Sequence, residues 1–150
     1  MGTDTAGMSA HADGDPADIL LVTPNHQFPT GTQMPASRRF ALLEAARRTG
    51  ALVIEDDYDS ELRSTPPPLL ALDTEGRVAM LGSFAKTLTP ALALGYLIVP
   101  PALRDRVADL CLPTSGLVQD AVARYMEAGG LRRHTARMRK EDRARRADFI

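Results

Sequence analysis

The stretch Gly82-Ser83-Phe84-Ala85-Lys86-Thr87-Leu88 decides how the rest of the chain is interpreted. It follows the apolar run Val78-Ala79-Met80-Leu81, which is typical of a buried strand, so Lys86 comes just past the carboxyl end of that strand. Open α/β sheets bind their ligands at this edge. A partly buried lysine loses its proton more easily than a solvated one, and its neutral amine can form a Schiff base with a carbonyl. The alternative is an ordinary surface lysine after a strand.

Short apolar runs separated by a helical pattern and loops predict an α/β fold. Strands are expected at residues 19–22, 51–54, 77–81 and 94–99, and helices at residues 35–49, 101–112, 116–128 and 131–150. This order predicts a mostly parallel sheet with covering helices and a helical C-terminal part. The link between the third and fourth strands is too short for a helical crossover, so the fourth strand is expected to be antiparallel.

Two smaller expectations concern the helix at 35–49 and the segment that follows the second strand. Phe40, Leu43 and Ala46-Arg47 recur at helical spacing, which predicts that this face of the helix packs inward. Residues 64–70 contain three consecutive prolines, and these predict a loop.

Length and composition are those of one globular domain or of a piece of a larger protein, with 150 residues and a formal net charge of −1. Neither nucleic-acid nor membrane binding follows from this overall charge. The single cysteine, Cys111, excludes an internal disulfide and lies in an apolar helical pattern that predicts burial. The chain has no apolar run long enough to span a membrane and no signal-peptide pattern, so we expect a cytoplasmic protein with no membrane partner.

The predicted helix at 131–150 is strongly basic, with eight Lys or Arg against three Asp or Glu. Such a helix could contact nucleic acid. However, its acidic residues are interspersed with the basic ones, and aromatic residues do not alternate with them. A solvated helix face is therefore the favoured interpretation.

Polar side chains follow three of the predicted strands. The first strand leads into the loop at 23–31, the second is followed by Asp56 and Tyr58, and the third by Ser83 and Lys86. The carboxyl ends of parallel strands meet at one edge of a sheet, so these groups are expected to share a crevice. Together they suit pyridoxal phosphate. The amine condenses with its aldehyde, the carboxylate keeps its pyridine nitrogen protonated, the phenol donates to its phenolate oxygen, and the serine hydroxyl with backbone amides holds its phosphate.

The acidic run Glu55-Asp56-Asp57 also permits other interpretations. Three carboxylates after a strand can form a magnesium site, as in phosphoryl-transfer enzymes, although no glycine-rich phosphate loop accompanies them here. The run can also be a solvated acidic loop. The residues themselves leave the three alternatives open.

Three motifs, in this order and spacing, resemble the aminotransferase-like domain of MocR-type regulators in the GntR superfamily. They are Thr23-Pro24-Asn25-His26-Gln27-Phe28-Pro29-Thr30-Gly31, Ile54-Glu55-Asp56-Asp57-Tyr58-Asp59-Ser60-Glu61 and Gly82-Ser83-Phe84-Ala85-Lys86-Thr87-Leu88. The resemblance runs from about Ile19 to the C-terminus. It implies a partial fold-type I, pyridoxal-phosphate-dependent large domain. It also implies an amino-acid or amine ligand and a homodimeric parent protein.

The resemblance also implies roles for single residues. It assigns Lys86 to the internal aldimine, Asp56 to the pyridine nitrogen, Tyr58 to the phenolate oxygen and Ser83 to the phosphate. Phe28 stands where metabolic aminotransferases usually carry an asparagine and MocR-type proteins an aromatic residue, so it favours a regulator. A free-standing class I or II aminotransferase is the second hypothesis, which leaves the question of enzymatic activity open.

Two departures from the family pattern lead to a third hypothesis, a non-catalytic remnant that binds no cofactor. Ala93 stands where family members usually carry an arginine that binds the phosphate. The winged-helix domain, through which the parent would bind DNA, is missing, as are the first part of the large domain and the small domain. We therefore expect a disordered leader at 1–17, a partial pyridoxal-phosphate-binding domain at 18–130, and the start of the helix to the small domain at 131–150.

Overall fold

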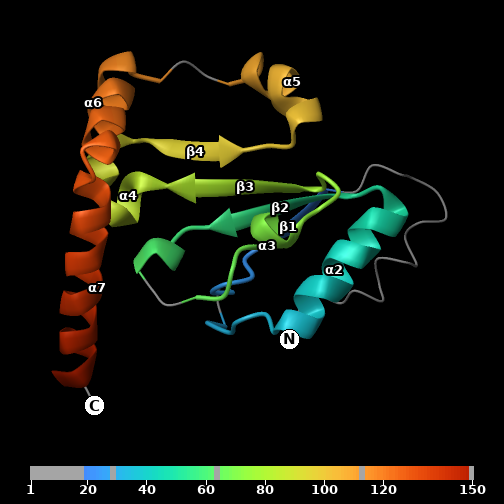
Figure 1. Cartoon of the computed structure of the whole chain (residues 1–150), viewed down its shortest axis with the longest axis horizontal. Helices are drawn as coiled ribbons and strands as arrows, with labels where there is room; N and C mark the ends of the chain where they lie inside the picture. The colour runs from blue at the N-terminus through green and yellow to red at the C-terminus, as the bar shows by residue number, and fades with distance from the viewer. Residues whose placement is uncertain (1–18, 28–29, 63–64, 112–113, 149–150) are drawn as a thin grey trace.

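A computed structural model describes residues 19–27, 30–62, 65–111 and 114–148. Its strands form one sheet in the order β1-β2-β3-β4, shown in Figure 1. The bounds are Ile19–Val22 for β1, Leu52–Asp57 for β2, Val78–Ser83 for β3 and Gly95–Ile98 for β4. The first three strands are parallel and β4 is antiparallel to β3, which confirms the predicted sheet.

The helices agree with the sequence patterns except in two places. The α-helices are α2 (Ala36–Thr49), α3 (Leu69–Leu72), α4 (Phe84–Thr87), α5 (Arg104–Ala108), α6 (Gly116–Glu127) and α7 (Gly130–Asp148). Single 3-10 turns are η1 (Ser60–Leu62), η2 (Pro90–Leu92) and η3 (Pro101–Leu103). The helix expected at 101–112 is therefore η3 followed by the short α5, and the loop expected at 64–70 runs into α3.

The predicted inward face of helix α2 is correct at Leu43 and Ala46, which pack in or against the core, but not at Phe40 and Arg47. Phe40 is 58% exposed, and the buried positions are Arg39, Leu42, Ala45 and Ala46. The buried face is therefore rotated from the predicted one, so that Arg39 takes the place expected for Phe40. The C-terminal end of the helix was predicted correctly: Gly50 adopts φ 79°, and its amide donates to the carbonyl of Ala46.

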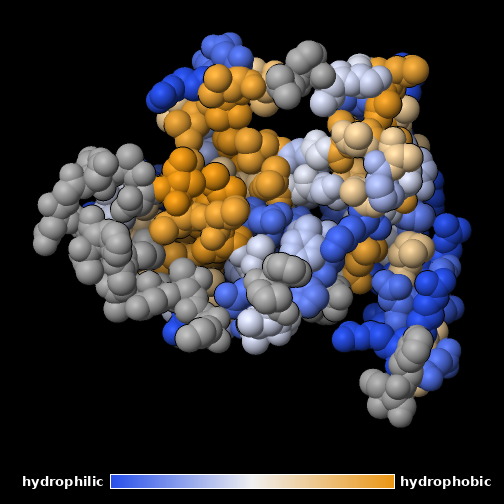
Figure 2. All heavy atoms as spheres, turned by 180° about the vertical axis from the view of Figure 1, so that it is seen from behind, coloured by the Kyte–Doolittle hydropathy of each residue, from blue (hydrophilic) through white to orange (hydrophobic). Residues whose placement is uncertain are grey.

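The hydrophobic core lies between one face of the sheet and helices α2 and α3. Its buried residues are Val22, Leu42, Ala46, Ala51, Val53, Leu69 and Val78. Side chains alternate along a strand, so the neighbours of the core residues point to the opposite face. Ile19 and Leu21 of β1 are 64% and 67% exposed there, and Leu81 and Leu97 are exposed as well. Figure 2 shows apolar surface gathered on this side.

Arg39 is buried at 1% exposure and connects three separate segments. Its Nε donates to Met34 O at 3.0 Å and its Nη1 to Pro67 O at 2.9 Å. Its Nη2 donates to Pro24 O at 2.9 Å and to Asn25 Oδ1 at 2.8 Å. Burial lowers the pKa of Arg39 below its usual value. The guanidinium fork thereby holds the loop after β1 and the loop before α3 against α2.

Helix α7 runs along the edge where β2 and β3 end, as Figure 1 shows. Arg139 attaches it to η1, because its Nε donates to Glu61 O at 2.6 Å. Cys111 is exposed, so the prediction of its burial was wrong, since α5 ends before it. In the described part of the chain, no helix is long and apolar enough to cross a membrane. The predicted leader lies among undescribed residues, and the predicted boundary at residue 130 stays a prediction.

Replacing Arg39 with methionine is expected to lower the free energy of unfolding by about 3–5 kcal/mol, because four acceptors, two of them in buried hydrogen bonds, lose their donor. Urea unfolding followed by circular dichroism measures this loss. Arg48→Met on the exposed surface of the same helix is the control and should change the value by about 0.5 kcal/mol or less. A similar small effect for both variants would contradict the role given to Arg39.

Candidate functional site

An open pocket of about 540 Å³ lies at the carboxyl edge of the parallel strands. Its lining residues are Leu21, Thr23, Asp56, Tyr58 and Lys86. Three of the four residues predicted for the site therefore share one pocket. The fourth, Ser83, is not among the lining residues, although it ends β3 three positions before Lys86.

The acidic run lies inside β2 and does not follow it, because this strand extends to Asp57. Side-chain alternation separates its carboxylates: Glu55 and Asp57 are buried, whereas Asp56 lines the pocket. Glu55 accepts hydrogen bonds from the amides of Leu69 at 2.9 Å and Leu70 at 3.1 Å, and so caps α3. The three carboxylates do not converge, which argues against the magnesium interpretation. The described residues contain no group of three or more potential metal ligands.

Burial raises the pKa of Asp56, the negative charge of Asp57 raises it further, and the charge of Lys86 acts in the opposite direction. A carboxylate with a raised pKa is a stronger base.

Lys86 lies on α4, which begins directly after β3. The residue is exposed, not partly buried as its sequence context indicated. Its Nζ lies 4.2 Å from the centroid of the Tyr58 ring, a contact that attracts a cation to the face of an aromatic ring. The amine that follows β3 therefore lies over the phenol ring that follows β2.

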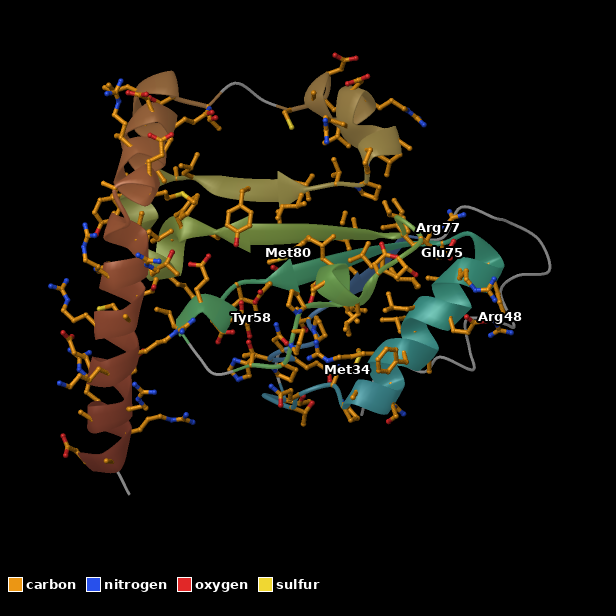
Figure 3. All side chains as sticks on the ribbon, viewed as in Figure 1. Met34, Arg48, Tyr58, Glu75, Arg77 and Met80 are labelled. Carbon is orange, nitrogen blue, oxygen red and sulfur yellow. The ribbon has the colours of Figure 1, made fainter. Side chains whose placement is uncertain are left out.

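Tyr58 extends from the end of β2 and is attached to the loop after β1. Its hydroxyl donates to the backbone oxygen of His26 at 2.8 Å. The ring of His26 in turn lies 2.9 Å from the carboxylate of Asp59, measured from Nδ1 to Oδ2. Figure 3 shows Tyr58 at one edge of the sheet and Glu75 with Arg77 at the opposite edge.

Sequence reasoning missed the pairing of His26 with Asp59, which are 33 residues apart, and the pocket position of Leu21, whereas Thr23 belongs to the loop expected at this crevice. The period of two along β1 could have indicated Leu21, because residues 19, 21 and 23 share a face. No local signal indicates the His26–Asp59 contact.

Ser83 and Ala93 have defined local roles. The Oγ of Ser83 accepts from the amide of Ala85 at 3.1 Å and caps α4, which leaves its own O–H as a donor. Ala93 follows η2 with φ 47°, a left-handed conformation that is unusual for a residue other than glycine. Phe28 lies outside the described residues.

This fold and site define an aminotransferase-like α/β protein. Residues 2–150 match the family described as aminotransferase class I and II. The chain therefore belongs to the class I and II aminotransferase family.

Two curated relatives are transcriptional regulators. The chain is 43% identical to the HTH-type pyridoxine biosynthesis transcriptional regulator PdxR of Corynebacterium glutamicum, over 97% of this chain and 33% of that protein. It is 39% identical to the probable rhizopine catabolism regulatory protein MocR of Rhizobium meliloti, over 88% of this chain and 28% of that protein. These similarities confirm the resemblance to MocR-type regulators. The chain spans about a third of the length of these relatives.

A solved structure confirms the fold-type I assignment. The chain matches the kynurenine aminotransferase of Pyrococcus horikoshii, solved in complex with PMP, with a TM-score of 0.73 and 32% identity. The match covers 91% of this chain and 35% of that one.

Removing the amine with Lys86→Met should move the titration of Asp56 to higher pH, because Lys86 is the charge that lowers the pKa of Asp56. Carbon-13 NMR of the aspartate carboxyl groups measures this change. Lys140→Met, which removes the only other lysine of the chain, is the control and should leave the titration of Asp56 in place. An unchanged titration in Lys86→Met would show that the two groups are not neighbours.

Proposed function

We propose that this chain is the pyridoxal-phosphate-binding, aminotransferase-like segment of a MocR-type transcriptional regulator. The observation that carries the proposal is one pocket lined by an amine, a carboxyl group and a phenol, from Lys86, Asp56 and Tyr58. The identity to regulators over nearly the whole chain supports the regulatory part.

The donors and acceptors of the pocket fit pyridoxal phosphate. Lys86 would attach the aldehyde, and Asp56 would hold a proton at the ring nitrogen. Tyr58 would offer its hydroxyl to the phenolate oxygen. Ser83 is not among the lining residues, but from the end of β3 its O–H would offer a donor to the phosphate. When bound, such a cofactor supplies an electron sink next to the carbon that carries an amino group.

Each residue makes a distinct contribution to the pocket. The short α4 carries Lys86, whose Nζ lies over the ring of Tyr58 in the lining of the pocket. Asp56 is a stronger base than a solvated aspartate because of burial and the neighbouring Asp57. Leu21 contributes an apolar side chain to the lining.

The parent protein is proposed to bind an amino acid or amine in this site, to act as a homodimer, and to contact DNA through a separate winged-helix domain. Its site of action would then be the cytoplasm. A winged-helix coding sequence upstream of this segment supports the regulator. An upstream region without one, together with amino-group transfer to a keto acid by the parent, supports a class I or II aminotransferase.

Titration with pyridoxal phosphate should produce the visible absorbance band of a cofactor joined to an amine. Borohydride reduction followed by peptide mass spectrometry should locate the attachment at Lys86, the residue that lines the pocket. Lys86→Ala should abolish both signals, and Lys140→Ala, the matched lysine control, should retain them. Attachment at both lysines, or no band at all, would support the non-catalytic remnant.

Introducing a charge at residue 93 tests the phosphate end of the proposed site. Ala93→Arg is expected to strengthen pyridoxal phosphate binding by about ten- to hundredfold, the usual value of a charge-assisted phosphate contact. Ala93→Gln is the control, because glutamine has a long side chain without a charge. Arginine and glutamine meet the same backbone cost at φ 47°, so the difference between the two variants isolates the added charge. An equal gain in affinity in Ala93→Gln would contradict the charge argument.

A further inference from the structure

The hydroxyl of Tyr58 already has an acceptor within the protein. It donates to the backbone oxygen of His26 at 2.8 Å. A phenol carries a single O–H hydrogen, so this hydrogen cannot serve a second acceptor at the same time. A ligand with a phenolate oxygen needs that same hydrogen.

The carbonyl group that accepts from Tyr58 belongs to His26, and the side chain of His26 holds it in place. The Nδ1 of His26 lies 2.9 Å from Oδ2 of Asp59, whose side chain is 8% exposed. A carboxylate only accepts, so Nδ1 carries the hydrogen of this bond. The imidazole also stacks on the Tyr58 ring, with centroids 6.1 Å apart. His26 is therefore hydrogen-bonded to Tyr58 through its backbone oxygen and to Asp59 through its ring.

The loop that contains His26 is closed by its own backbone hydrogen bonds. The amide of Gln27 donates to Thr32 O at 2.9 Å, and the amide of Gly31 donates to Gln27 O at 2.7 Å. Gly31 adopts φ 68°, and a side chain added there would meet Nε2 of His26 at 3.4 Å. The loop therefore passes close to the imidazole of His26 at Gly31.

We propose that the hydrogen-bonded pair of His26 and Asp59 acts as a lock: it keeps the backbone oxygen of His26 in place as the acceptor of the Tyr58 hydroxyl. This lock must open before Tyr58 can donate to a bound phenolate. The inference rests on the proposed function, because the ligand is the same pyridoxal phosphate. His26 and Asp59 are positioning residues, since they act through Tyr58. Two acceptors compete for one hydrogen, so the lock lowers the affinity of the site by about the value of one hydrogen bond, roughly two- to tenfold.

Loosening the lock should tighten binding. In the full 150-residue chain, His26→Phe keeps the backbone carbonyl and an aromatic ring beside Tyr58 but cannot donate to Asp59. Asp59→Leu removes the carboxylate that accepts from Nδ1 of His26. Both variants should bind pyridoxal phosphate about two- to tenfold more tightly than the wild type, and with faster association, in absorbance titrations and stopped-flow measurements.

Two further comparisons separate the lock from a general structural effect. In a Tyr58→Phe background the same two substitutions should change nothing, because no hydroxyl hydrogen is left to release. Asp59→Asn keeps an acceptor for His26 and should behave like the wild type. Unchanged or weaker binding in His26→Phe and Asp59→Leu, or an equal gain in the Tyr58→Phe background, would overturn the proposal. Circular dichroism checks the fold of each variant.

An independent measurement distinguishes failure of the lock from failure of the proposed function. If the wild type binds no pyridoxal phosphate, the proposed function fails, and the lock is then tested without ligand. The hydroxyl proton of Tyr58 should exchange slowly with water in the wild type and in Asp59→Asn, and faster in His26→Phe, as measured by NMR. Equal exchange in all three proteins would overturn the lock.

Discussion

The buried guanidinium of Arg39 is the interaction on which the rest of the structure depends. A charge with 1% exposure is stable only when its donors are satisfied, and here four protein oxygens satisfy them. These oxygens belong to the loop after β1, the segment before α2 and the loop before α3. The loop after β1 carries His26, so the same guanidinium that fixes the fold also fixes the acceptor of the Tyr58 hydroxyl.

The two faces of strand β2 carry carboxyl groups with different roles. Glu55, with its carboxylate on two amides of α3, serves the packed face, whereas Asp56 one residue later serves the pocket. Burial raises the pKa of both carboxyl groups, but the consequences differ. At Glu55 the hydrogen bonds hold a helix in place. At Asp56 the added basicity becomes available to a ligand.

The sequence predicted the sheet and most of the pocket because both depend on local patterns. Apolar runs identified the strands, the short link to β4 indicated its direction, and strand ends identified Asp56, Tyr58 and Lys86. The burial of Arg39 could not be predicted, because a charged residue in a helix is normally on the surface and its acceptors come from distant loops. The contact of His26 with Asp59 was missed for the same reason, since it forms only when two loops meet.

Leu21 belongs to two surfaces at once. It is part of the uncovered apolar side of the sheet, and it also forms a wall of the pocket. Anything that packs against Leu21 from that side, whether more of the polypeptide or a separate molecule, therefore also contacts a wall of the pocket. The packing of that side of the sheet and the shape of the pocket are therefore coupled through one leucine side chain.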